Sequence, residues 1–85
     1  QNLTFLDLTG CQVSNYGLGE LVKLQKLEKL YLHGCARITD AGLKKVAKLQ
    51  KLKELAVSYT QITKAGVAEL QKALPNCKIA HDAKN

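Results

Sequence analysis

The strongest constraint on this chain is a pattern of leucines that occurs three times at nearly constant spacing. Each copy reads L-x-x-L-x-L-x-x followed by Cys or Thr, and the copies begin at Leu3, Leu27 and Leu52. Self-similarity with a period between about 20 and 50 residues indicates a stack of similar units, each burying its apolar face against its neighbours. The sequence therefore predicts one elongated domain rather than a single closed core.

Within each unit the apolar residues change from the period of a strand to the period of a helix. Alternation over 6–8, 30–32 and 55–57 predicts three short strands. Each strand is followed by apolar residues on one predicted helical face. These are Leu18, Leu21, Val22 and Leu24, then Leu43, Val46, Ala47 and Leu49, then Val67, Leu70, Ala73 and Leu74. Strands and helices in strict alternation predict an α/β fold with a parallel sheet.

The segment between each strand and its helix is also repeated, as CQVSNYGL, CARITDAGL and TQITKAGV. The hydroxyl residues Ser14, Thr39 and Thr63 stand where a side chain can cap a helix N-terminus, and Asp40 adds favourable negative charge there. A glycine recurs in the first helical turn, although glycine costs a helix about 1 kcal/mol relative to alanine. We therefore expect a close approach of the helix to a neighbour at Gly17, Gly42 and Gly66.

These motifs resemble the leucine-rich repeat family over about residues 1–81, and the phrase ITDAGL resembles its cysteine-containing and short bacterial subclasses. The resemblance implies an α/β solenoid of three strand–helix coils plus a short fourth terminal strand, with the parallel sheet on the concave face. The expected coils are 3–26, 27–51 and 52–75, followed by a strand at 77–81 and a solvated tail at 82–85. The family's position after the strand, here Cys11, Cys35 and Thr60, bonds to loop backbone, and we expect buried structural thiols there.

The resemblance also implies where a partner would bind, because the concave sheet is the usual binding surface of such solenoids. The outward strand residues are Phe5, Asp7 and Thr9, then Lys29, Tyr31 and His33, then Glu54, Ala56 and Ser58, with Lys78 and Ala80 beyond them. Tyrosine is enriched among the residues that dominate interface energies. The sequence thus predicts a protein–protein interaction module centred on Phe5, Tyr31 and His33, although an ordinary solvated sheet face with scattered aromatics fits the same pattern.

Two other functions remain open from the sequence. Eukaryotic relatives in the cysteine-containing subclass select substrates for F-box-type ubiquitin ligases, but this chain shows no F-box segment. The net charge of +6 would suit nucleic acid or an acidic partner on a Lys-rich convex face. With Arg37 as the single arginine and few aromatics to stack on bases, the sequence favours a solvated lysine face over a nucleic-acid partner. The lysines concerned are Lys23, Lys26, Lys29, Lys44, Lys45, Lys48, Lys51 and Lys53.

The sequence gives little support to catalysis, cofactors or metals. His33 with Thr9 or Ser58 is the nearest hydroxyl–imidazole pairing, and no carboxylate is placed to orient it. His33 and Cys35 supply two metal ligands, whereas a structural zinc site takes four. We therefore expect no enzyme activity, no cofactor and no metal.

Cysteine usage and hydropathy bear on the compartment. The cysteine count is three and no CxxC occurs, so we expect free thiols in a reducing, cytoplasmic compartment. No apolar run approaches the length that would span a membrane.

The two ends of the repeat differ. His81 occupies the position held earlier by Leu8, Leu32 and Val57, so the last strand turns polar, whereas nothing polar precedes Leu3. We expect the chain to be the C-terminal portion of a longer repeat protein, or to self-associate through its open first coil.

Overall fold

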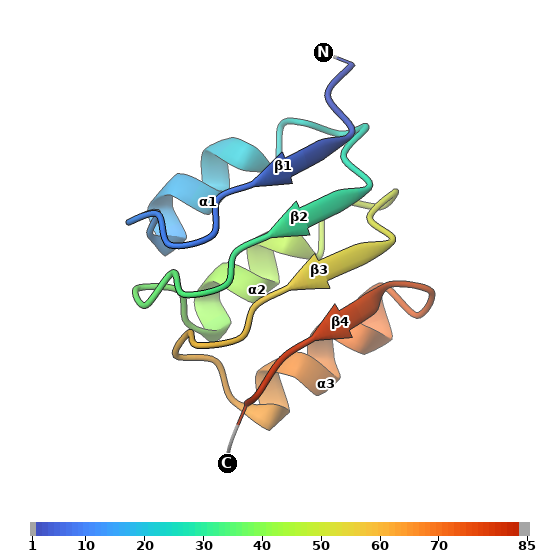
Figure 1. Cartoon of the computed structure of the whole chain (residues 1–85). Helices are drawn as coiled ribbons and strands as arrows, with labels where there is room; N and C mark the ends of the chain where they lie inside the picture. The colour runs from blue at the N-terminus through green and yellow to red at the C-terminus, as the bar shows by residue number, and fades with distance from the viewer. Residues whose placement is uncertain (1, 84–85) are drawn as a thin grey trace.

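Four short strands alternate with three helices along the chain (Figure 1). The computed structural model describes residues 2–83. The elements are β1 (Phe5–Asp7), α1 (Asn15–Leu21), β2 (Lys29–Tyr31), α2 (Asp40–Val46), β3 (Glu54–Ala56), α3 (Lys64–Ala73) and β4 (Lys78–Ala80). The strands form one parallel sheet in the order β1-β2-β3-β4, and the helices form a second layer behind it. The predicted α/β architecture, including the terminal strand, is confirmed.

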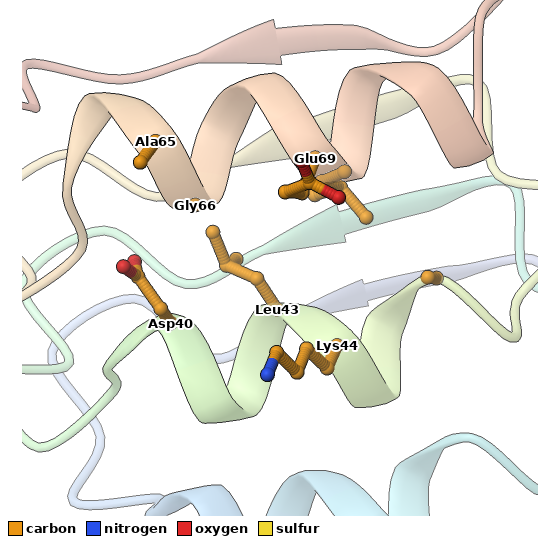
Figure 2. Close-up of a pocket in the computed structure, with 8 residues that line it drawn as sticks. Asp40, Leu43, Lys44, Ala65, Gly66 and Glu69 are labelled. Carbon is orange, nitrogen blue, oxygen red and sulfur yellow. The ribbon is translucent and has the colours of Figure 1, made fainter.

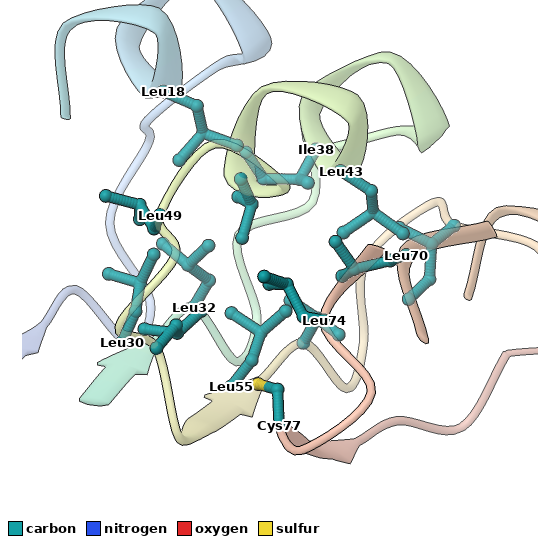
Figure 3. Packing of buried hydrophobic residues seen from close by; sticks show 14 of the residues in the cluster. Leu18, Leu30, Leu32, Ile38, Leu43, Leu49, Leu55, Leu70, Leu74 and Cys77 are labelled. Carbon is teal, nitrogen blue, oxygen red and sulfur yellow. The ribbon is translucent and has the colours of Figure 1, made fainter. Parts of the chain in front are cut away.

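The strands are aligned so that equivalent leucines stand side by side. Leu6 pairs with Leu30, Leu30 with Leu55, and Leu55 with Ile79. Leu30 and Leu55 of this row point into the same buried cluster as Leu18, Leu43 and Leu70 of the helices (Figure 3). Leu30 and Leu55 are almost fully buried, while Leu6 and Ile79 at the two ends of the row are half-buried. The core is thus a continuous stripe between the two layers.

The first two helices are shorter than the hydrophobic pattern predicted. α1 ends at Leu21 and α2 at Val46, so Leu24 and Leu49 lie beyond their helices. After each of these helices the chain forms tight turns, closed by hydrogen bonds between residues three positions apart. Leu24 N–H donates to Leu21 O at 2.9 Å, and Leu49 N–H donates to Val46 O at 2.9 Å. Leu49 is still fully buried, because a tight turn can point an apolar residue inward as a helix does.

Each helix begins at the predicted cap, and the caps also bind between coils. The Ser14, Thr39 and Thr63 hydroxyls accept bonds from backbone N–H groups of their own helices. In addition, Asn15 Oδ1 accepts the Thr39 N–H at 3.0 Å, and Asp40 Oδ1 accepts the Thr63 N–H at 2.9 Å. Asn15 and Asp40 are equivalent first residues of α1 and α2. Each therefore secures the start of the next helix.

The close approach predicted at the repeated glycines is confirmed at Gly42 and Gly66, where the neighbour is the preceding helix, whereas a Cβ on Gly17 would meet Val13 of its own coil. A Cβ on Gly42 would collide with the Asn15 amide and with Leu18 of α1. A Cβ on Gly66 would collide with the Asp40 carboxylate of α2, which faces it across the gap between the helices (Figure 2). Glycine is required at Gly42 and Gly66 because the side chains that secure the next cap occupy the space of their missing methyl groups.

The predicted buried position after the strand differs among the coils. Cys35 is fully buried, its Sγ donates to Leu8 O at 3.1 Å, and burial raises the pKa of its thiol. Thr60 Oγ1 donates to Val57 O at 2.7 Å. Cys11, however, is exposed, which corrects the expectation of a buried thiol there. Cys35 is covered by the first coil, and among residues 2–83 no coil covers Cys11 in the same way. All three cysteines are free.

One loop residue is held in a strained backbone conformation. Gly10, Gly34 and Tyr59 are equivalent turn residues with φ of 76°, 74° and 61°. The left-handed region costs a residue with a side chain roughly 1–2 kcal/mol, and glycine avoids this cost.

We expect Tyr59→Gly to raise the free energy of unfolding by about 0.5–1 kcal/mol, after allowing for the greater freedom of glycine in the unfolded chain. Urea denaturation followed by circular dichroism measures the change. Gly34→Ala is the matched control: its Cβ would meet nothing closer than Gly10 N at 3.7 Å, so its destabilisation reports the conformational cost alone. Equal stability of Tyr59→Gly and the parent chain would contradict this account.

The C-terminal residues continue to pack after β4. Asp82 Oδ1 accepts the Tyr59 N–H at 3.0 Å, and Ala83 packs against the core. Of the predicted tail 82–85, positions 84–85 lie outside the described residues. None of the helices in the described part of the chain has the length and apolar character needed to cross a bilayer.

Candidate protein-binding face

The outward strand residues form three rows across the sheet, in the predicted register. The first row is Phe5, Lys29, Glu54 and Lys78, and the second is Asp7, Tyr31, Ala56 and Ala80. The third row follows the strands and contains Thr9, His33 and Ser58, joined through backbone bonds from Gly10 N–H to His33 O and from Gly34 N–H to Ser58 O. We call these residues the outward sheet face.

Tyr31 lies near the centre of this face and is held from both sides. Its ring meets the Phe5 ring edge-on, with centroids 5.2 Å apart and planes at 81°. Its hydroxyl donates to Glu54 Oε1 at 3.1 Å on the next strand. That hydrogen bond to a carboxylate raises the pKa of Tyr31. The ring and the hydroxyl of Tyr31 therefore each contact a side chain of a neighbouring strand.

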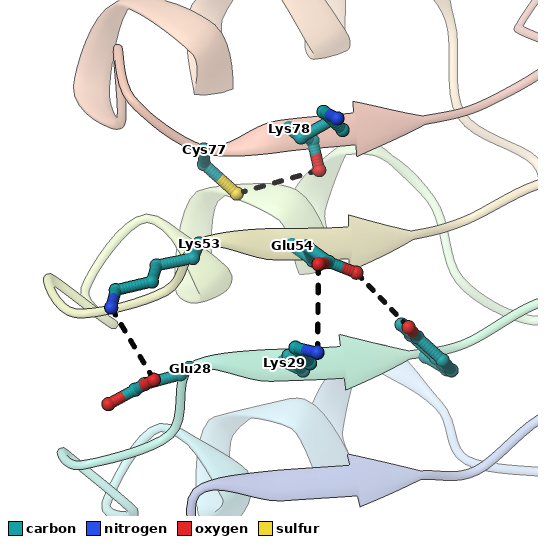
Figure 4. Close-up of polar contacts among 7 residues, drawn as sticks. Glu28, Lys29, Lys53, Glu54, Cys77 and Lys78 are labelled. Carbon is teal, nitrogen blue, oxygen red and sulfur yellow. Dashed lines mark hydrogen bonds and ion pairs between the residues drawn. The ribbon is translucent and has the colours of Figure 1, made fainter.

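The charged residues of the first row also bind one another. Glu54 Oε2 lies 3.8 Å from Lys29 Nζ, and at the start of the same strands Lys53 Nζ lies 3.6 Å from Glu28 Oε1 (Figure 4). These pairs are largely exposed, and exposed pairs contribute about 0–1 kcal/mol each to stability. Glu54 is thus bonded to both Tyr31 and Lys29, whereas Lys78 belongs to none of the ion pairs among residues 2–83.

Two hollows flank Tyr31. One, of about 340 Å³, is lined by Phe5, Lys29 and Tyr31 together with Thr4 and Glu28. The other, of about 290 Å³, has Leu55 and the small Ala56 in its lining. The remaining residues around the second hollow are Tyr31, His33, Glu54, Lys78 and Ala80. Tyr31 is therefore the wall that both hollows share, and each hollow combines an apolar surface with a lysine.

Backbone N–H groups of the third row donate hydrogen bonds to side chains of the outward sheet face. His33 Nδ1 accepts the Ser58 backbone N–H at 3.1 Å, so the imidazole is not paired with the Ser58 hydroxyl. Asp7 Oδ1 accepts the Thr9 N–H at 3.0 Å, and hydrogen bonds from the hydroxyl and the backbone of Thr9 lower the pKa of this carboxyl. The arrangement orients the His33 and Asp7 side chains against the backbone of the third row. Among residues 2–83, no three His, Cys, Asp or Glu side chains gather as a metal ion would require.

The lysines assigned to a Lys-rich convex face do not all lie on the helices. Lys44 and Lys45 lie on α2, but Lys48, Lys51 and Lys53 follow it because α2 ends at Val46. Lys45 Nζ donates to Asn15 O at 3.0 Å, and Lys53 pairs with Glu28. Lys29 lies on β2 in the outward sheet face. The positive charge is therefore spread over loops, one short helix and the sheet.

The comparison with protein families agrees with the repeat seen in the structure. The family described as leucine-rich repeats in two copies matches residues 1–45, and the family described as a leucine-rich repeat matches residues 48–70. The chain belongs to the leucine-rich repeat family. Leucine-rich repeats are generally protein-interaction modules and are usually non-catalytic.

The leucine-rich repeat pattern was sufficient to find the outward sheet face, because alternation along each strand fixes which residues point out. It also placed Tyr31 between Asp7 and Ala56, with Phe5 diagonally beside it. It did not indicate the bond between Tyr31 and Glu54, which joins adjacent rows on neighbouring strands. A Tyr and a Glu two positions apart in aligned repeats are the signal that could have suggested it.

Proposed function

We propose that this leucine-rich repeat chain is a protein-interaction module that engages its partner through the outward sheet face, with Tyr31 as the central contact. The observation that carries the proposal is the placement of the Tyr31 ring, which contacts Phe5, bonds to Glu54 and lies between two hollows. An aromatic side chain that loses little freedom on binding contributes more of its burial energy to affinity. The two hollows would receive apolar side chains of the partner.

We further propose that the chain forms the C-terminal part of a longer repeat array. The support is the contrast between its two sides. In the first coil Leu3 is 42% exposed, and Cys11 is exposed as well. On the other side of the stack, Gln71 occupies the position equivalent to the apolar Val22 and Ala47. Its Nε2 donates to Leu74 O and to Cys77 O, at 2.9 Å each. One side of the stack thus exposes apolar side chains, and the other carries a polar side chain that bonds to the backbone.

The binding proposal is tested with the single substitution Tyr31→Ala. Immobilised wild-type chain and variant are exposed to the same lysate, and captured proteins are quantified by mass spectrometry. Truncation of a central interface tyrosine commonly costs about 2 kcal/mol or more, so we expect captured partners to fall by about tenfold or more. Circular dichroism checks that the helices are unchanged.

Tyr16→Ala is the matched control, because Tyr16 is 80% exposed and lies on α1, away from the outward sheet face. Tyr16→Ala makes the same chemical change in the helical layer, and we expect the captured proteins to be retained. Proteins that bind the Tyr31→Ala chain as well as the wild type, or that are lost only with Tyr16→Ala, would contradict the assignment of the binding face.

A further inference from the structure

We propose that the open side of the first coil docks a further strand–helix coil of the same repeat, one whose helix begins with Asn or Asp. The inference rests on the proposed longer array and specifies the neighbouring coil. It follows from comparing each position of the first coil with its equivalents in the two coils that do have a preceding neighbour.

The apolar side chains on this side match side chains that are buried elsewhere. Leu27 and Leu52 are 0% and 4% exposed, whereas the equivalent Leu3 is 42% exposed. Cys35 is fully buried and the equivalent Cys11 is exposed. The same holds for Leu8 and Val13, which are half-buried, while their equivalents are fully or nearly fully buried. Those equivalents are Leu32, Val57, Ile38 and Ile62. A preceding coil covers each of the buried positions.

The free edge of β1 carries a backbone carbonyl at the position where each later strand accepts a hydrogen bond from the strand before it. Leu8 N–H donates to Tyr31 O, Leu32 N–H to Ala56 O, and Val57 N–H to Ala80 O. Each strand therefore donates to the strand that follows. Asp7 O is the equivalent of Tyr31, Ala56 and Ala80 O, so it would accept from a parallel strand placed before β1.

The start of α1 shows which residue the preceding helix must carry. Thr39 N–H is bound by Asn15 and Thr63 N–H by Asp40. The equivalent donor is Ser14 N–H, and residues 2–83 supply no such acceptor to it. Gly17 is equivalent to Gly42 and Gly66, which are glycines because Asn15 and Asp40 fill the space of a Cβ. At Gly17 a Cβ would lie 2.8 Å from Val13 Cγ2 of its own coil, so Val13 also favours glycine there, and residues 2–83 place no side chain of another helix against it. The first coil thus keeps the glycine and the donor that fit an Asn or Asp side chain.

A second copy of this chain does not satisfy the same requirement. Stacked head to tail, a second copy would offer its last helix, where the residue equivalent to Asn15 and Asp40 is Lys64. Lysine has donors and no acceptor, so it cannot receive the Ser14 N–H. Two copies meeting through their first coils would each present the same donor. The chemistry therefore favours a coil with Asn or Asp over self-association.

The test adds the proposed neighbour to the intact chain. Residues 27–49, which contain Asp40, are copied in front of Gln1, and Cys35 within the copy is replaced by Thr, the residue found at the equivalent Thr60. The natural Cys11 then reports docking, because it is exposed in the chain alone while Cys35 and Cys77 are buried. We expect maleimide labelling of Cys11 to slow by about tenfold or more. Urea unfolding should remain a single transition with an m-value larger by about a quarter, since m scales with the surface exposed on unfolding.

The matched control is the same fusion with Asp40→Lys in the added copy, which places lysine where Lys64 stands in the last coil. We expect its Cys11 to label at least several-fold faster than in the Asp fusion. Labelling of Cys11 at the rate of the unfused chain in both fusions would overturn the docking face together with the longer array. Equal protection in both would overturn the requirement for Asn or Asp while leaving the array intact. Sedimentation of the unfused chain at tens of micromolar should show a monomer, and a dimer with protected Cys11 would overturn the choice of occupant.

Discussion

Leu30→Ala is expected to lower the free energy of unfolding by about 3–4 kcal/mol, because a buried Leu→Ala change loses both transfer energy and packing around the cavity. Leu30 is fully buried at the middle of the row formed by Leu6, Leu30, Leu55 and Ile79. A domain has a total stability on the order of 5–15 kcal/mol, so the variant would be only marginally folded at room temperature. Urea denaturation followed at 222 nm measures the loss.

Leu6→Ala makes the same chemical change one strand away and serves as the control. Leu6 is half-buried because β1 is the edge of the sheet. With less apolar surface to lose and no closed cavity to leave, we expect a cost of about 1 kcal/mol. Equal losses for the two variants would contradict a stack in which each coil is buried by its neighbours.

Gly66→Ala is expected to destabilise the chain by about 2 kcal/mol, although alanine is the better helix former. The new Cβ would displace the Asp40 carboxylate, which binds the backbone N–H of Thr63 at 2.9 Å and its hydroxyl at 2.5 Å. The substitution therefore adds a steric clash and removes the contact that secures the start of α3. Thermal and urea unfolding of the purified variant both measure the effect.

Gly19→Ala separates this contact from the general effect of glycine in a helix. Gly19 also lies in a helix, but a Cβ there would meet only the flexible end of Lys45, whose Nζ is 3.4 Å away. We expect the substitution to stabilise the chain by about 0.5–1 kcal/mol, the usual penalty of a helical glycine. If Gly66→Ala were also stabilising, the contact between Gly66 and Asp40 would not have the role assigned to it.

The sheet and its alignment were predictable because they depend on spacing alone. Leucines at equivalent positions of successive repeats must stand side by side if each strand is to bury the same face, and this fixed Leu6 against Leu30 and Leu30 against Leu55. Alternation along the strand then assigned Tyr31 to the outward sheet face. Both inferences use only the period of the chain, which the sequence shows directly.

Contacts between coils were harder to predict, because local rules supply a sufficient reason for the same residues. Asp40 fits the preference for acidic residues in the first turn of a helix, and nothing in its own coil indicates that it binds Thr63. Asn15 binds Thr39 in the same way, 24 residues away. The lengths of α1 and α2 were overestimated for a related reason: Leu24 and Leu49 keep helical spacing while lying in tight turns.

The outward sheet face was predicted as a set of residues but not as an arrangement. Alternation names the residues that point outward, while the choice of rotamer depends on partners in neighbouring rows. Tyr31 leans between Phe5 and Glu54 because one neighbour offers a ring and the other a carboxylate. The two hollows beside it result from that orientation and from the small side chain of Ala56, which the pattern of the repeat leaves free to vary.

Thr39 N–H donates to Asn15 and Thr63 N–H donates to Asp40, so in both cases the start of a helix depends on a side chain of the coil before it. Loss of α3 leaves the starts of α1 and α2 as they were. Loosening of α1, by contrast, withdraws the support of α2, and loosening of α2 then withdraws the support of α3. Local unfolding that begins in the first coil should therefore loosen the starts of α2 and α3 more readily than local unfolding of the last coil loosens the starts of α1 and α2.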